Sequence, residues 1–154
     1  MLAACTPVRG IVASGNQHRQ MAEAVLHAYQ AQDASNLFGL VPGKKDLKDL
    51  RVEFGRPEGA SELKLAKVPS YSALKDSIQS RFGAGLSGVT DKKGLELKAV
   101  ENLQSIELKG TDAAWHFCKI TMASPGDVCI RKLTLMTFKG RCFLMSIDAE
   151  NGVE

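Results

Sequence analysis

Three strand-like runs near the C-terminal end constrain the fold of this chain more than any other feature. They are AAWHFCKITM at 113–122, VCIRKLTLMTF at 128–138 and RCFLMSIDA at 141–149, and all are rich in β-branched and aromatic residues. Pro125-Gly126 separates the first two runs, and Lys139-Gly140 separates the last two. Extended runs cut by glycine-containing turns are typical of a β-meander. The sequence therefore predicts three consecutive antiparallel strands.

The two turns assign a register to this meander, because the length of each turn fixes which residues lie opposite one another. The predicted partners are Ile120 with Arg131, Cys118 with Leu133, Leu135 with Leu144, and Arg131 with Asp148. One face then carries His116, Cys118, Ile120, Met122, Cys129, Arg131, Leu133, Leu135, Cys142, Leu144, Ser146 and Asp148. The other carries Trp115, Phe117, Lys119, Thr121, Ile130, Lys132, Thr134, Met136, Phe138, Phe143, Met145 and Ile147. Because both faces are substantially apolar, we expect both to be covered.

The composition favours one globular domain. Apolar residues make up 44% of the 154 residues and charged residues 24%, which is typical of a chain that folds around a core. The formal net charge is only +3 and the lysines are scattered, so the basic stripe with aromatic platforms that nucleic-acid binding needs is missing. No apolar run approaches the roughly 20 residues of a membrane span.

The N-terminal residues suggest a tether. Leu2-Ala3-Ala4-Cys5 resembles the lipobox of bacterial lipoproteins, in which the cysteine is lipidated and becomes the first residue of the mature chain. The resemblance implies that Cys5 is a lipidation site and that residues 1–15 form the tether. It also implies a lipid-anchored protein on the periplasmic side of a bacterial envelope. The charged and hydrophobic regions of a signal peptide are missing, and a cytoplasmic protein with an ordinary cysteine is the alternative.

Between the tether and the meander, the sequence predicts helices, a hairpin and a further strand. Apolar residues at helical spacing predict a helix over 16–32, and Asp33 caps a short second helix that runs to Leu40. Alternating apolar residues at 50–54 and 63–68, separated by a Gly-Arg-Pro-Glu-Gly loop, predict a hairpin. A clear amphipathic helix spans 70–82 and is expected to end at Gly83. Residues 95–108 are interpreted as one long bent strand or as a tight pair broken near 101–102.

This order of elements resembles the NTF2-like (cystatin-like, SnoaL-like) superfamily. The matching segments are AEAVLHAYQAQD at 22–33 and FKGRCFLMSID at 138–148, the second being similar to the closing hairpin of those domains. The resemblance implies a single α+β domain over 16–150, in which N-terminal helices pack on a curved, cone-like antiparallel sheet with an internal pocket. The rival interpretation is a PsbP/Mog1-like sandwich, which shares the helix-then-meander plan but normally closes with a helix.

A set of polar residues on one predicted face offers candidate chemistry. The register places His116 on the face that also carries Arg131, Ser146 and Asp148. NTF2-like enzymes often place an acid or a histidine opposite a tyrosine from the first helix. The resemblance therefore implies His116, Asp148 and Tyr29 as candidate catalytic residues, with Arg131 and Ser146 in the pocket. A base buried in such a pocket could abstract a proton. We favour a structural interpretation, in which Arg131 and Asp148 form a cross-strand pair and His116 bonds to backbone.

The cysteines and histidines do not form a metal or thiol motif. The sequence holds no C-x-x-C, H-x-x-x-H or H-E-x-x-H pattern. Cys118, Cys129 and Cys142 share a predicted face but are staggered along the strands, so we expect them to be reduced and buried. No cofactor and no metal are expected.

These observations favour a non-catalytic binding or assembly module, and a small-molecule enzyme of the isomerase or dehydratase type is the alternative. The two long helices suffice to cover one face of the sheet, which leaves an apolar face open. We therefore expect a homodimer, or a protein partner on the same surface, through Trp115, Phe117, Met136 and Phe143. A small apolar ligand in the pocket is a further expectation, and nucleic acid is not.

Overall fold

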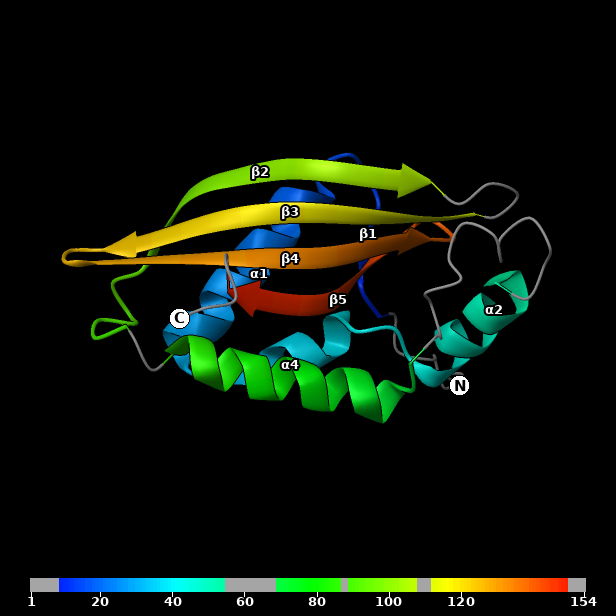
Figure 1. Ribbon diagram of the computed structural model, residues 1–154, viewed down its shortest axis with the longest axis horizontal. Coiled ribbons are helices and arrows are strands. Elements are labelled where there is room, and N and C mark those ends of the chain that lie inside the picture. Colours follow the sequence, from blue (N-terminus) through cyan, green and yellow to red (C-terminus); the bar gives the residue numbers. More distant parts are fainter. Residues whose placement is uncertain (1–8, 55–68, 87–88, 108–111, 150–154) are drawn as a thin grey trace, which may run out of the picture.

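The computed structural model shows an α+β fold in which helices precede a strongly curled antiparallel sheet, as the sequence predicts (Figure 1). It describes residues 9–54, 69–86, 89–107 and 112–149. The helical elements are α1 (Gln17–Ala31), the 3-10 helix η1 (Ala34–Leu40), α2 (Lys44–Phe54) and α4 (Tyr71–Leu86). The strands are β1 (Ile11–Val12), β2 (Glu96–Glu107), β3 (Ala113–Ser124), β4 (Asp127–Phe138) and β5 (Arg141–Ala149). They lie in the order β1-β5-β4-β3-β2.

The predicted meander is confirmed over β3 and β4. Ile120 lies opposite Arg131 and Cys118 lies opposite Leu133. The turn from β4 to β5 is the expected two-residue loop, with positive φ at both Lys139 (53°) and Gly140 (75°). Positive φ at both central positions matches the twist of the flanking strands, which explains why glycine follows lysine here.

A β-bulge breaks the predicted register between β4 and β5. Leu135 lies opposite Leu144, as predicted, but the preceding residue of β4, Thr134, lies opposite Ser146. Met145 is therefore an extra residue on β5, and each later residue of β5 is displaced by one position. The sequence has neither a glycine nor a proline at this point that would indicate a bulge.

The bulge makes the predicted pairing of Arg131 with Asp148 wrong. Asp148 lies opposite Lys132, and Arg131 lies opposite Ala149. Asp148 forms an ion pair with Arg81 of α4 and accepts a hydrogen bond from Ser146 Oγ at 3.2 Å. Because a one-residue displacement exchanges the faces of a strand, Ser146 and Asp148 leave the face that carries His116.

Helix α1 packs on the face of the sheet that carries His116. In Figure 1, α1 passes behind the strands and α4 runs below β5. The side chain of His18 meets His116 of β3, and Tyr29 at the other end of α1 stacks on Phe82 of α4 with ring centroids 4.5 Å apart. The core between these layers consists of fully or nearly fully buried side chains, among them Met21, Val25, Tyr29, Ile78, Phe82, Cys118, Ile120, Leu133, Leu135 and Leu144.

The prediction of a strand at 50–54 is wrong, because these residues belong to helix α2. Leu47 and Leu50 are each 1% exposed, while Val52 is 59% exposed, which is a helical pattern and not an alternating one. The carboxylate of Asp46 accepts a hydrogen bond from the Gly43 amide at 2.9 Å and so helps to start the helix. The second predicted strand of that hairpin, 63–68, lies outside the described residues.

The end of α4 differs from the sequence prediction, and β2 decides between the two interpretations of its segment. Helix α4 continues through Gly83 to Leu86, so Gly83 does not end it. Gly83 keeps a helical backbone, and a Cβ at this position would meet no atom outside that local helix backbone within 4 Å. Residues 96–107 form one long strand with two register shifts against β3, which matches the first of the two interpretations offered for this segment. No helix in the described part of the chain is long and apolar enough to cross a membrane.

Candidate functional site

His116 is held by two hydroxyl groups on neighbouring strands. Its Nδ1 lies 2.9 Å from Ser105 Oγ on β2, and its Nε2 lies 3.0 Å from Thr137 Oγ1 on β4. The His18 ring lies edge-on at 5.2 Å between centroids. Burial lowers the pKa of His116, the charge of His18 lowers it further, and Glu107 partly opposes both. These contacts favour a neutral imidazole in a structural network across three strands.

Tyr29 lies far from His116. His18, which contacts His116, and Tyr29 lie eleven residues apart on α1, or roughly 16 Å along the helix axis. The Tyr29 hydroxyl is buried without a hydrogen bond of good geometry. Burial raises its pKa, and the nearby Arg131 guanidinium only partly offsets that effect. Tyr29 and His116 therefore do not converge on one substrate position.

The remaining predicted pocket residues are divided between the two faces. Arg131 lies on the inner face near Tyr29, whereas Ser146 and Asp148 lie on the face of Thr134 and Lys132. Among the described residues, the predicted set of acid, histidine and tyrosine is thus not assembled. The sequence placed these residues together because the β5 bulge was not foreseen.

The three cysteines of the sheet are free and buried. Burial raises the pKa of the Cys118 thiol to about 11 and that of Cys142 to about 12. Burial also raises the pKa of Cys129, although Arg131 opposes this. Thiols with such pKa values carry little thiolate and act as small apolar residues. Cys5 lies outside the described residues, and no cluster of three or more potential metal ligands occurs in the described part of the chain.

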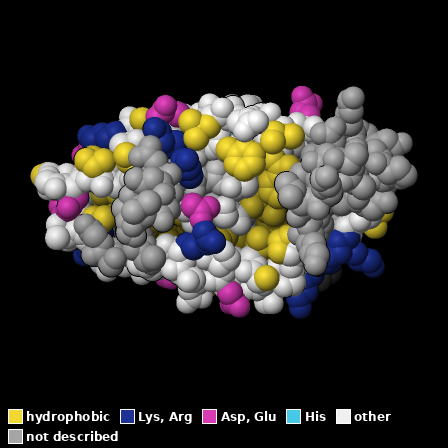
Figure 2. Space-filling model, viewed as in Figure 1, with side chains coloured by type: hydrophobic (Ala, Val, Ile, Leu, Met, Phe, Trp, Pro, Cys, Tyr) yellow, Lys and Arg dark blue, Asp and Glu magenta, His cyan; other side chains and the backbone are white. Residues whose placement is uncertain are grey.

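Two of the four predicted interface residues are already buried within the chain. Met136 is 0% exposed and Phe143 is 1% exposed, whereas Trp115 and Phe117 are half-buried. Apolar side chains gather near the middle of the face seen in Figure 2. A partner on the sheet face that carries these four residues would contact Trp115 and Phe117 more directly than Met136 and Phe143, because the latter two are already buried. The predicted homodimer stays a prediction.

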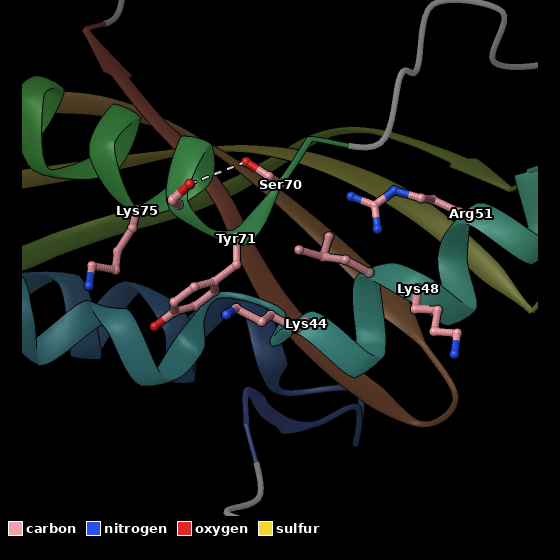
Figure 3. Close-up of a pocket in the computed structure, with 8 residues that line it drawn as sticks. Lys44, Lys48, Arg51, Ser70, Tyr71 and Lys75 are labelled. Atoms are coloured by element: carbon pink, nitrogen blue, oxygen red, sulfur yellow. Dashed lines mark hydrogen bonds between the residues drawn. The ribbon is translucent and has the colours of Figure 1, made fainter.

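A basic groove lies between α2 and the start of α4. Its volume is about 620 Å³ (Figure 3). The residues that line it are Lys44, Leu47, Lys48, Arg51, Ser70, Tyr71, Ser72 and Lys75. We refer to this cavity as the basic groove.

Helix α2 supplies three of the four cations from one side. Lys44, Lys48 and Arg51 follow the helical spacing i, i+4, i+7 and so lie along one face of α2. Lys45, one residue along, points elsewhere and pairs with Asp49 at 3.3 Å. The strand predicted at 50–54 conceals the basic stripe of α2 in the sequence. Helical spacing would have placed the three cations together.

The first turn of α4 forms the opposite wall. Ser70 Oγ accepts a hydrogen bond from the Ala73 amide at 3.1 Å and so caps the helix. The Lys75 ammonium lies over the rings of Phe38 and Tyr71, at 5.1 and 5.7 Å from their centroids. The Arg9 guanidinium, 5.0 Å from the centroid of the Tyr71 ring, also donates to Tyr71 Oη at 3.2 Å.

The basic groove carries uncompensated positive charge. No acidic residue lines it, and none of its four cations has an ion-pair partner among the residues that the structure describes. Two acids of α2 have other partners, Asp46 the Gly43 amide and Asp49 the ammonium groups of Lys45 and Lys139. A concave surface lined by one sign of charge concentrates counter-ions, and the start of α4 adds its positive dipole end.

Comparison of this chain with protein families, with curated proteins and with solved structures finds no match.

Proposed function

We propose that this chain is a non-catalytic binding module whose basic groove holds an anionic ligand. The observation that carries the proposal is the set of four cations around a cavity that no described acidic residue lines. Charge-assisted hydrogen bonds from lysine and arginine to carboxylate or phosphate are the strong ones in proteins, and a helix N-terminus favours the same ligands.

Binding is favoured over catalysis because the cavity lacks the groups that chemistry needs. Ser70, Tyr71 and Ser72 supply the hydroxyls of the basic groove, and among the described residues no histidine or carboxylate lines the cavity to activate them. The alternative, an isomerase or dehydratase, depended on His116, Asp148 and Tyr29, which are dispersed.

The family, the lipidation of Cys5 and the cellular location are parts of the same proposal. An NTF2-like domain is supported by the curled antiparallel sheet with its helices, together with the two matching sequence segments. Lipidation of Cys5 and a place in the bacterial envelope are supported by the lipobox-like Leu2–Cys5 segment alone. Intact mass of the precursor, expressed with lipoprotein processing intact, tests this part: an unmodified Cys5 contradicts it.

Titration with inorganic phosphate and pyrophosphate at low ionic strength, followed by backbone amide NMR, tests the binding function. We expect shifts that concentrate in α2 and in the first turn of α4, and weaker binding in Lys48→Gln and Arg51→Gln. Added salt should weaken binding, because exposed charges are screened. The control is Lys45→Gln, which removes the same charge from the same helix outside the basic groove. Shifts spread over the whole surface, or equal losses in the control, would contradict a specific site.

A further inference from the structure

The cations of the basic groove are distributed in two groups. In Figure 3, Lys44 and Lys75 lie on either side of Tyr71, whereas Arg51 and Lys48 lie toward the other end of the cavity. Lys44 and Arg51 are seven residues apart on one face of α2, which is roughly 10 Å along the helix axis. This separation favours a separate anionic group at each end over a single phosphate or carboxylate shared by both ends.

We propose that the natural ligand carries two anionic groups, phosphate or carboxylate, held about 10 Å apart by a less polar spacer. This inference rests on the proposed function and specifies the chemical class of its ligand. Each end of the basic groove holds one anionic group, and the spacer lies along the wall between them.

The first end combines cations with aromatic rings and helix amides. Lys75 is positioned by the rings of Phe38 and Tyr71, and Arg9 lies against the same Tyr71 ring. Arg9 is itself fixed, because it donates to the Val41 carbonyl at 3.0 Å and to the Phe38 carbonyl. The Ala73 amide donates to Ser70 Oγ, while the amides of Tyr71 and Ser72 have no partner within the helix. This end therefore presents donors and positive charge that are already ordered.

The second end is formed by Arg51 with Lys48. A guanidinium offers a planar pair of donors that matches a carboxylate or phosphate. A lysine adds a positive charge that requires no particular orientation of the ligand. Within the described part of the chain, Arg51 donates one long 3.4 Å hydrogen bond to the Pro69 carbonyl, which leaves further guanidinium donors for a ligand. An anionic group at this end gains a two-point contact.

The wall between the two ends is apolar on the α2 side. Leu47 lies one turn after Lys44 and one turn before Arg51, lines the cavity and is 1% exposed. A charged spacer would lose water there without gaining a partner. An aliphatic or neutral spacer is therefore the better match.

Linking two anionic groups increases affinity without any new contact. Once one group is bound, the other is held at high local concentration near its own site, provided that the spacer spans the distance. A spacer that is too short to span the two ends gives no such increase in affinity. Affinity should therefore depend on spacer length, which a site for one anion would not show.

The test compares inorganic phosphate with two alkane bisphosphonates by calorimetry on the full chain. In the longer compound the phosphonates reach about 10 Å apart, and in the shorter one they cannot. We expect the longer compound to bind at least about tenfold more tightly than phosphate or the shorter compound. Arg51→Gln and Lys75→Gln, which each disable one end, should reduce the longer compound to the affinity of phosphate. Lys45→Gln should preserve the difference.

The outcomes separate this inference from the proposed function. If all three anions bind in the basic groove with affinities that differ less than about threefold, the two-anion ligand is wrong and the binding function stands. If none of them binds, the proposed function is wrong as well. If the longer compound binds tightly but Lys75→Gln leaves its affinity unchanged, the assignment of the first end is wrong.

Discussion

Met145 determines where Asp148 points. Because Met145 is an extra residue in β5, Asp148 turns from the inner face to the side of Lys132 and reaches Arg81 on α4. The Arg81–Asp148 pair is partly exposed, with side-chain exposures of 56% and 36%. An ion pair of this kind contributes little to stability, and its value lies in fixing the C-terminal half of β5 beside α4.

Double-mutant cycles with Asp148→Asn should distinguish the observed pairing from the predicted one. We expect a coupling free energy of ~0.2–1 kcal/mol with Arg81→Gln, since exposed pairs fall in this range. With Arg131→Gln we expect additive effects, because Arg131 and Asp148 lie on different faces. Urea melts measure both. A larger coupling with Arg131 would show that the bulge is absent in solution.

The pair of His18 and His116 should make the protein less stable in mild acid. Burial lowers the pKa of both imidazoles below the usual value of 6.5. The unfolded chain then binds protons more readily, so stability is full above about pH 6.5 and falls as the pH drops below it. Urea melts should show a lower free energy of unfolding at pH 5.5 than at pH 7.5, and this difference should be smaller in His116→Gln. The control, His27→Gln on the exposed side of α1, should show the same difference in unfolding free energy as the wild type. If His116→Gln also shows the wild-type difference, the His18–His116 pair is not responsible for it.

At the scale of elements, helix α4 does not end where the local signal predicts. Glycine after an amphipathic run predicts a helix end, yet α4 continues for three residues beyond Gly83. A similar conflict affects α2, where Leu50, Val52 and Phe54 alternate as in a strand. There, Leu47 and Leu50 pack into the core together, and that burial favours the helix.

Gly83→Ala should stabilise the protein. The position is helical, exposed and free of close neighbours, so alanine should add about 0.5–1 kcal/mol by restricting the unfolded chain. Gly126→Ala should do the opposite, because Gly126 has a φ of 94° that an L residue adopts only with strain. Urea midpoints followed by circular dichroism compare the two variants. A destabilised Gly83→Ala would mean that α4 ends at Gly83 after all.

At the scale of the whole molecule, the sequence predicted the parts of the fold that depend on local periodicity. The helix over 16–32, the β3–β4 register and the turn at Lys139-Gly140 are confirmed, because side-chain spacing and turn glycines determine them. The bulge and the basic groove were not predictable in the same way. A bulge depends on packing against other elements, and the basic groove joins Lys44 to Lys75 through contacts that no local pattern encodes.

The core thiols should report on unfolding of the whole domain. Cys118, Cys129 and Cys142 are at most 3% exposed and lie on the face that carries His116, against which α1 packs. Their pKa values are raised, so the folded protein should resist alkylation at pH 8, while the unfolded chain should react at all three positions without reductant. Because β3, β4 and β5 each carry one of these cysteines, local fraying cannot expose all three together. Peptide mapping after alkylation in increasing urea should therefore show the three positions labelled in parallel, with a midpoint equal to that of circular dichroism. Earlier labelling of Cys142 alone would mean that β5 detaches from the sheet before the rest unfolds, and protection of any pair in the unfolded chain would reveal a disulfide.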